Sequence, residues 1–231
     1  MIEEPPLLTI KRPTRRPTQA QIDAFQNVAT SFVVDAMKGG GTLSPTIRPL
    51  GEGVDIHCVA AGPAVTADTG PGDIMGLLAA LGSIQEGDIV VSAFSGFQGC
   101  AAAGDRVCAM IKNCGAAGFV TDGPVRDYPG LVEVGLPIWC TGLNPDTPQN
   151  TGPGRVGLPI QLGGREVDPG DMIVADRDGV VVVPFERLDE VIAALEVVIE
   201  LETALDAELK DGLTIPDPVR ELLASDKVKY I

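Results

Sequence analysis

Blocks of apolar residues alternate with polar and turn residues through the middle of the chain. Short apolar runs bounded by Gly, Pro or Asp predict strands, and longer stretches with apolar residues at helical spacing predict helices. The predicted strands are 60–66, 88–93, 119–121, 137–139, 156–162, 172–175 and 180–183, and helices are predicted at 73–81 and 101–113. The last two strands form a hairpin across an Asp- and Gly-containing turn. This order of elements predicts a mixed α/β fold with helices packed on one side of the sheets.

Helical spacing also marks both ends of the chain. Thr18 and Gln21 resemble a capping box, and the helix they begin continues through Phe25 and Phe32 until the glycines at 39–41 stop it. From Phe185 the pattern predicts one long helix that ends at Gly212. We therefore divide the chain into a Pro-rich arm (1–17), an α/β domain (18–184) and a C-terminal helix with its tail (185–231).

One carboxylate interrupts the apolar stripe of the predicted C-terminal helix. Apolar residues recur every three or four positions, and Glu202 fills the place between Val198 and Leu205. Glu202 either points into water, where the stripe leaves the core, or is presented to a functional site. A long striped terminal helix often packs on a partner subunit, so we expect a homo-oligomer.

Charge and composition narrow the classes of partner. The chain has 231 residues, of which 45% are hydrophobic, and a formal net charge of −15. Such a charge repels nucleic acids and anionic membranes, so neither is expected as a partner. An anionic small substrate would need a local cation. No apolar run is long enough to span a membrane, and the first residues lack the pattern of a secretory signal, so we expect a cytoplasmic protein.

The usual metal and nucleophile residues are scarce. The five cysteines form no Cys-x-x-Cys pair, and we expect buried, reduced thiols rather than a zinc site. His57 is the single histidine, in a predicted strand at 54–59 where a structural role is the usual one. No phosphate loop or dinucleotide-binding glycine pattern is present. Asp73 is expected to cap a helix, and Asp176 and Asp178 to form a turn. Catalysis would rest on carboxylates, arginine and a hard metal ion.

The strongest candidate for chemistry follows the strand 118–121. A turn at 122–124 ends the strand, and Arg126 and Asp127 come directly after it, while Gly104 and Asp105 lie earlier, before a helix. Successive side chains of an extended or turning backbone point in different directions. Arg126 can therefore face an anion while Asp127 faces a metal ion; the alternative is a surface ion pair beside a turn.

Three motifs in order resemble a known family. Gly104-Asp105 leads a helix, 122–127 follows a strand, and 167–184 carries Asp-Pro-Gly-Asp and then Asp-Arg-Asp-Gly before Val-Val-Val-Val-Pro. Together they resemble the family of 4-hydroxy-4-methyl-2-oxoglutarate aldolase, 4-carboxy-4-hydroxy-2-oxoadipate aldolase and the regulator of ribonuclease activity A, over about residues 25–205. The resemblance implies a layered β/β/α core of the swivelling-domain type with N-terminal helices and a long C-terminal helix. It also implies trimers or hexamers with active sites at subunit boundaries.

The resemblance assigns a role to each residue of the motifs. Asp127 would bind Mg²⁺ or Mn²⁺, and Arg126 would hold the pyruvate-like part of the substrate. The backbone N–H groups of 104–107 would bind the keto acid, with the Asp105 carboxylate on metal-bound water. Asp35 and Glu202 of a neighbouring subunit would complete the catalytic group. The chain departs from the family in having Arg106, Val107 and Cys108 where small apolar residues are usual, which leaves the natural substrate open.

The implied activity is that of a metal-dependent, class II-type aldolase. Such a lyase cleaves a 4-hydroxy-2-oxo dicarboxylic or tricarboxylic acid to pyruvate and a second keto acid, and decarboxylates oxaloacetate by the same enolate chemistry. One alternative is a non-enzymatic protein-binding regulator like the ribonuclease regulator. Another is a lyase or hydrolase for a different acid, selected by Arg106. The long C-terminal helix with Glu202 favours the aldolase.

Overall fold

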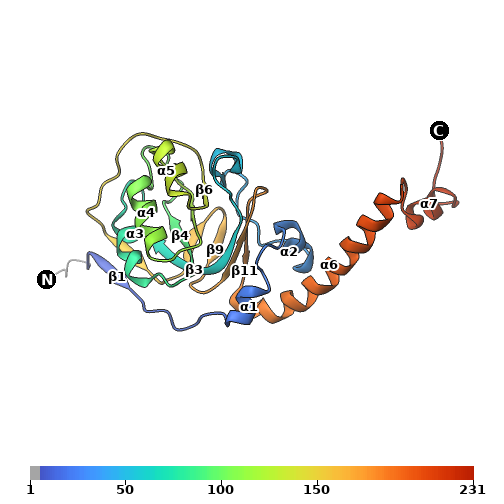
Figure 1. The fold of residues 1–231 in the computed structure, drawn as a ribbon, viewed down its shortest axis with the longest axis horizontal. Helices are drawn as coiled ribbons and strands as arrows, with labels where there is room; N and C mark the ends of the chain where they lie inside the picture. The colour runs from blue at the N-terminus through green and yellow to red at the C-terminus, as the bar shows by residue number, and fades with distance from the viewer. Residues whose placement is uncertain (1–5) are drawn as a thin grey trace.

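Four neighbouring parallel strands form the middle of a nine-stranded sheet in the computed structural model, which describes residues 6–231 (Figure 1). In sheet order they are β3 (Ala60–Asp68), β4 (Ile89–Ala93), β5 (Gly118–Thr121) and β6 (Ile138–Cys140). The helices α3 (Met75–Ala80), α4 (Asp105–Asn113) and α5 (Tyr128–Val134) connect each of these strands to the next. The carboxyl ends of the parallel strands therefore lie along one edge of the sheet.

Shorter strands extend this sheet and pack against it. The edges are made by β1 (Leu8–Ile10) with β7 (Gly154–Val156), and by β2 (Arg48–Pro49). The hairpin of β10 (Met172–Ala175) and β11 (Val180–Val183) pairs with the first half of β3, whose second half pairs with β4. The strands β8 (Ile160–Leu162) and β9 (Arg165–Val167) form a separate two-stranded sheet.

The predicted hairpin is confirmed, and it is buried on both faces. Ile173 and Val182 belong to the main core, together with residues of β4 and α4. Their neighbours Val174 and Val181 belong to a second core with the N-terminal helices and the start of the C-terminal helix. Burial of both faces explains why these strands are continuous apolar runs rather than alternating ones.

The fold is mixed α/β, as predicted, but the expectation that helices cover one side of the sheets was wrong. The helices α3, α4 and α5 cover the parallel strands, whereas α1, α2 and α6 pack on the outer face of the β10–β11 hairpin (Figure 1). The sequence pattern did not show which elements cover each face of the hairpin. A strand buried on both faces is a continuous apolar run, whether helices or other strands pack against it.

The predicted N-terminal helix is two helices, α1 (Gln19–Asp23) and α2 (Thr30–Ala36). The capping box at Thr18 and Gln21 is confirmed. The chain breaks where Asn27 takes a left-handed φ of 58°. The second helix begins where the backbone N and the hydroxyl of Thr30 each donate to the carboxylate of Asp176, at 2.8 Å. Asp176, predicted as a turn former, also accepts from the N–H of Asp178, so it joins the hairpin turn to α2.

Three other predicted elements have different bounds. Residues 54–59 form no strand. Ile56 and Cys58 are buried and alternate with more exposed neighbours, as in a strand, but no described strand pairs with this segment. His57 is exposed. The strand expected at 156–162 is two strands, separated by a turn with Gly157 at a φ of 70°. The helix expected from residue 101 begins at Asp105, because 101–104 run along the loop that follows β5.

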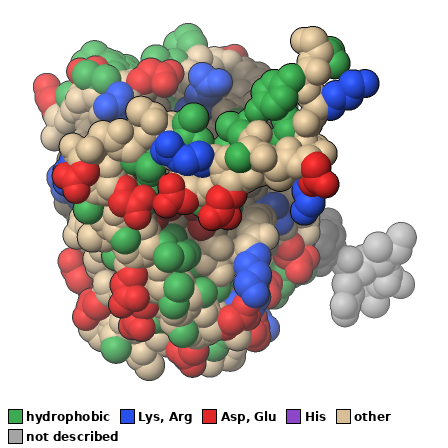
Figure 2. Space-filling model, turned by 90° about the vertical axis from the view of Figure 1, so that its right-hand side faces the viewer, with side chains coloured by type: hydrophobic (Ala, Val, Ile, Leu, Met, Phe, Trp, Pro, Cys, Tyr) green, Lys and Arg blue, Asp and Glu red, His purple; other side chains and the backbone are tan. Residues whose placement is uncertain are grey.

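The long C-terminal helix is confirmed as α6 (Leu188–Lys210), preceded by a 3-10 turn from Phe185 and followed by α7 (Asp217–Leu223). Leu188, Val191 and Leu195 are buried, whereas the later stripe residues Leu205 and Leu209 are exposed, and the helix projects from the body of the protein (Figure 1). Figure 2, viewed from that end, shows hydrophobic side chains exposed among many acidic ones. None of the helices in residues 6–231 is long and apolar enough to cross a membrane.

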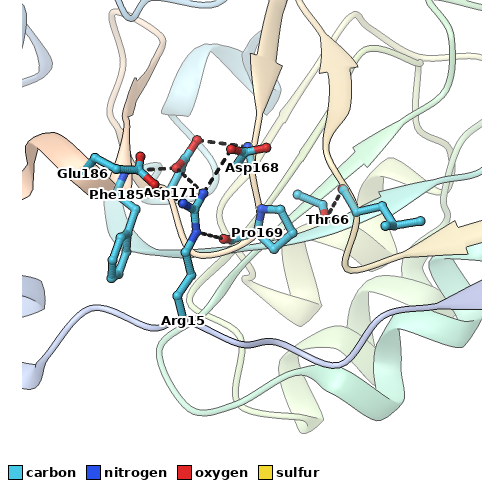
Figure 3. A network of polar contacts seen from close by, with 8 residues as sticks. Arg15, Thr66, Asp168, Pro169, Asp171, Phe185 and Glu186 are labelled. Carbon is cyan, nitrogen blue, oxygen red and sulfur yellow. Dashed lines mark hydrogen bonds and ion pairs between the residues drawn. The ribbon is translucent and has the colours of Figure 1, made fainter.

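Residues 6–17 are fastened to the body by β1 and by two arginines. The guanidinium of Arg15 donates to Asp168, Asp171 and Glu186 and stacks over Phe185, 5.1 Å from the ring centre (Figure 3). Arg16 pairs with Asp88, which is almost fully buried. Burial raises the pKa of both Asp88 and Asp171, and the paired arginines act in the opposite direction. These contacts tie the start of the chain to the turns before β4 and β10.

Four of the five cysteines are buried, and Cys114 is exposed. Burial raises the pKa of Cys58, Cys100 and Cys108 and raises that of Cys140 to about 11. The thiolate is the reactive form. These four thiols are therefore protected from reagents because they are buried and because they stay protonated.

A thiol-specific reagent should therefore modify one cysteine in the folded protein at about pH 8 and all five after unfolding. Absorbance of the released chromophore counts the thiols. Cys114→Ser should remove the fast reaction. Two or more fast thiols in the native protein would contradict the buried positions.

Candidate functional site

A cleft of about 340 Å³ lies at the carboxyl edge of the parallel strands. The end of the loop after β4 and the first turn of α4 contribute residues 103–107. The loop after β5 contributes Arg126 and Asp127, and Ile74 and Pro148 also line the cleft. The two loops meet because β4 and β5 are neighbours and because Ala103 and Val125 pair beyond the ends of these strands. Ligands of open α/β sheets characteristically bind outside this edge.

Gly104 lets the side chains of Asp127 and Arg126 lie close to the start of α4. A Cβ at this position would lie 2.5 Å from Oδ2 of Asp127 and 3.3 Å from Cγ and Nε of Arg126. Gly130 has the same relation to Asp105, because a Cβ there would lie 2.5 Å from the Asp105 Oδ2 and 2.8 Å from its Cβ. The two glycines let the charged side chains lie against backbone.

The first turn of α4 opens on the cleft without a capping side chain. Gly104 is the N-cap, and the backbone N of Arg106 donates to Oδ1 of Asp105 at 2.7 Å. Among residues 6–231 no hydrogen-bond acceptor meets the N–H of Asp105 or Val107. Free N–H groups and the positive end of the helix dipole make such a turn a good site for an anion.

Arg126 and Asp127 form a single ion-pair contact with each other, and further hydrogen bonds hold both residues in place. Nε of Arg126 lies 3.4 Å from Oδ2 of Asp127, and Nη1 donates to the hydroxyl of Thr147 at 2.6 Å. Asp127 has a left-handed φ of 64°, and its carbonyl accepts from the N–H of Leu131 in the first turn of α5. A strained backbone of this kind is often found at functional positions. The left-handed turn carries the chain from the Arg126 loop directly into α5.

The far side of the cleft depends on Asp73. Its Oδ2 accepts from the backbone N of Thr151 and of Gly152, and its Oδ1 accepts from the N of Met75 at 2.7 Å. Burial alone would raise the pKa of Asp73, but these hydrogen bonds outweigh it and lower that pKa. Asp73 thus accepts from the first N–H of α3, although Ile74 rather than Asp73 is the N-cap residue, and it also fixes the loop that carries Thr147 and Pro148.

Sequence reasoning missed Ile74, Thr147 and Pro148. Ile74 and Pro148 line the cleft, and Thr147 accepts from Arg126. All three are placed by the pairing of Asp73 with Gln149, a contact between distant segments for which the sequence has no local signal.

Two polar side chains outside the cleft, Asp122 and Tyr128, make hydrogen bonds within the fold. The carboxylate of Asp122 accepts from the N–H groups of Phe94 and Gly96, and burial raises its pKa. The hydroxyl of Tyr128 donates to Asp55, and this hydrogen bond raises the pKa of Tyr128. The titratable groups that line the cleft are therefore two carboxylates, Asp105 and Asp127, and two guanidiniums.

Two residues of the predicted site lie elsewhere in the subunit. Asp35 is exposed on α2 and lines a separate hollow beside the β10–β11 turn. Glu202 is half-buried on the projecting part of α6. The other predicted residues, 104–107 with Arg126 and Asp127, all line the one cleft.

The profile of the RraA-like family, described as Aldolase/RraA, matches residues 30–182. The chain belongs to the RraA-like family. A relative from Halalkalibacterium halodurans, named "Putative 4-hydroxy-4-methyl-2-oxoglutarate aldolase", is 38% identical over 170 residues, 72% of this chain and 79% of that protein. Protein DlpA of Legionella pneumophila is 29% identical over 186 residues, 76% of this chain and 29% of DlpA. The family resemblance seen in the motifs is confirmed.

Two solved structures share the fold. RraAS2 of Streptomyces coelicolor, described as an unusual member of the RNase ES inhibitor RraA protein family, matches with a TM-score of 0.71 at 28% identity, over 84% of this chain and 100% of that chain. A protein from Pseudomonas syringae pv. tomato matches with a TM-score of 0.74 at 24% identity, over 87% of this chain and 96% of that chain. Because RraA-like proteins bear both aldolase and inhibitor names, the chemistry of the cleft must decide between these functions.

Gly104→Ala tests whether the close approach positions the charged pair. The added Cβ displaces the ends of two flexible side chains, so we expect the free energy of unfolding to change by less than about 1 kcal/mol. The affinity for oxalate in the presence of Mg²⁺, measured by calorimetry, should fall about tenfold because Asp127 and Arg126 move. Gly82→Ala is the control, since a Cβ there meets nothing within 4 Å. Unchanged oxalate affinity in Gly104→Ala would contradict this role.

Proposed function

We propose that the protein is a divalent-metal-dependent aldolase that cleaves a 4-hydroxy-2-oxo acid with further carboxylates to pyruvate and a second keto acid. The observation that carries the proposal is the meeting of Arg126, Asp127 and the uncapped start of α4 in one cleft. The similarity to a relative with an aldolase name supports it. Decarboxylation of oxaloacetate would follow from the same enolate chemistry.

The residues of the cleft fit Mg²⁺ or Mn²⁺. Residues 6–231 contain no cluster of three or more His, Cys, Asp or Glu side chains placed to hold a metal ion. Mg²⁺ needs no such cluster, because it keeps several waters and is commonly held by one or two carboxylates. Asp127 would be a direct ligand, and Asp105 would hold a metal-bound water. When bound, the ion would supply a Lewis acid for the negative charge that develops on the keto oxygen.

The side chains and amides of the cleft would bind and orient the substrate. Arg126 can bind the carboxylate of the keto acid through two parallel hydrogen bonds, while Thr147 fixes the orientation of its guanidinium. The free N–H groups at the start of α4 would stabilise the enolate left when the bond between C3 and C4 breaks. The C4 hydroxyl must lose its proton, and a carboxylate acting through water can accept it.

We propose that a neighbouring subunit supplies the remaining carboxylates. In one subunit Glu202 and Asp35 lie outside the cleft, and the part of α6 that carries Glu202 has exposed Leu201 and Leu205 beside it. Exposed apolar side chains along a helix are characteristic of a surface that packs on another protein. A trimer, or a hexamer of two trimers, would let α6 of one subunit reach the cleft of the next.

Pyruvate release from 4-hydroxy-4-methyl-2-oxoglutarate tests the activity. Lactate dehydrogenase and NADH report the pyruvate, and the rate should depend on Mg²⁺ and be lost in excess EDTA. Arg126→Ala should lower kcat/KM by about a hundredfold or more, the size expected for a lost stabiliser of developing charge. Asp127→Ala should remove the metal-dependent rate, whereas Arg12→Ala, an exposed arginine outside the cleft, should keep it. Metal-independent release, or none, would contradict the proposal.

Mixing two inactive variants tests the shared site. Glu202→Gln and Asp127→Ala should each be inactive alone. After co-expression in equal amounts, about a quarter of the sites should combine an intact cleft with an intact neighbouring Glu202. The steady-state rate of the mixture measures this fraction. If Glu202 acted within its own subunit, or had no role, the mixture would show no gain over the sum of the separate variants.

A further inference from the structure

Arg106 is a cation whose position the fold itself does not explain. It lies at the second residue of α4, within the first turn, where the helix dipole favours negative rather than positive charge. Its side chain is exposed and lines the same cleft as Arg126. A residue that opposes the local electrostatics of its helix is more often kept for binding than for stability.

The guanidinium of Arg106 has no partner among residues 6–231. Nine other arginines donate a hydrogen bond to a carboxylate, a hydroxyl or a backbone carbonyl. Arg12 is the other arginine that makes no such contact with residues 6–231, and it is exposed outside the cleft. The chain has a net charge of −15, so carboxylates are abundant. An arginine that pairs with none of them is available to bind an anionic ligand.

The charges of the cleft leave Arg106 available to a second anionic group. Arg126 lies beside Asp127 and Thr147, where it can bind the carboxylate next to the keto group. Arg106 lies on a different segment of the cleft, in the first turn of α4. We propose that Arg106 determines specificity by binding a carboxylate of the substrate that is remote from the keto acid end. This inference rests on the proposed function, and it selects keto acids with two or more carboxylates over monocarboxylic ones.

Two unreactive probes that share the keto acid end test the proposal. Pyruvate has the keto acid alone, and 2-oxoglutarate adds one remote carboxylate. In calorimetry with Mg²⁺, the unmodified oligomer should bind 2-oxoglutarate more tightly than pyruvate. Arg106→Gln should weaken 2-oxoglutarate about tenfold, the effect of one charge-assisted hydrogen bond in an open cleft, and leave pyruvate within about twofold. Added salt should reduce the difference between the two probes.

Control variants separate binding from general charge and from stability. Arg12→Gln removes the same charge outside the cleft and should change neither affinity. Arg106→Lys should retain part of the preference for 2-oxoglutarate. The Tm of Arg106→Gln should be equal to or above that of the unmodified protein, because the substitution removes a cation from a helix N-terminus.

Each other outcome has a definite meaning. If both probes bind and Arg106→Gln weakens them equally or not at all, the role of Arg106 is wrong and the keto acid site stands. If neither probe binds the unmodified protein with Mg²⁺, the proposed function and this inference are both wrong. A large fall in Tm for Arg106→Gln would show a structural role and also overturn the inference.

Discussion

The candidate site depends on how closely two backbone segments approach beyond the ends of β4 and β5. A Cβ at Gly104 would lie 2.5 Å from Oδ2 of Asp127 and 3.3 Å from Nε of Arg126, so these side chains would have to move. This approach places the positive end of α4 beside a guanidinium and a carboxylate, and neighbouring parallel strands are what bring the segments together. The charges are thereby arranged by the backbone rather than by a dedicated network of side chains.

Much of the remaining structure holds these segments still. Asp122 fastens the loop after β4, and Asp73 fastens the loop with Thr147 to the start of α3. Both are buried carboxylates that accept several backbone N–H groups, so each one fixes a loop that would otherwise be free to move. At the opposite side, Arg15 and Arg16 tie the beginning of the chain to buried Asp171 and Asp88. Buried carboxylates of this acidic protein thus hold loops and residues 15–16 in place, whereas Asp105, Asp127 and two arginines line the cleft.

Local patterns predicted the parts of this protein that local interactions determine. The β10–β11 hairpin and α6 follow from apolar periodicity. The site residues 104–107, Arg126 and Asp127 were predicted from short continuous motifs and their resemblance to a family, and they line one cleft. The break between α1 and α2 was missed because Asp176, about 150 residues away, caps Thr30. The apolar stripe marks the position of Glu202 along α6, whereas its distance from the cleft depends on the direction in which α6 leaves the body of the protein.

A crystal structure of the protein with Mg²⁺ and oxalate tests the central claim most directly. We expect an ion beside Asp127 with water among its ligands, and an oxalate carboxylate on the guanidinium of Arg126 near the first turn of α4. Oxalate and metal ordered elsewhere on the protein, with the cleft holding solvent alone, would contradict it.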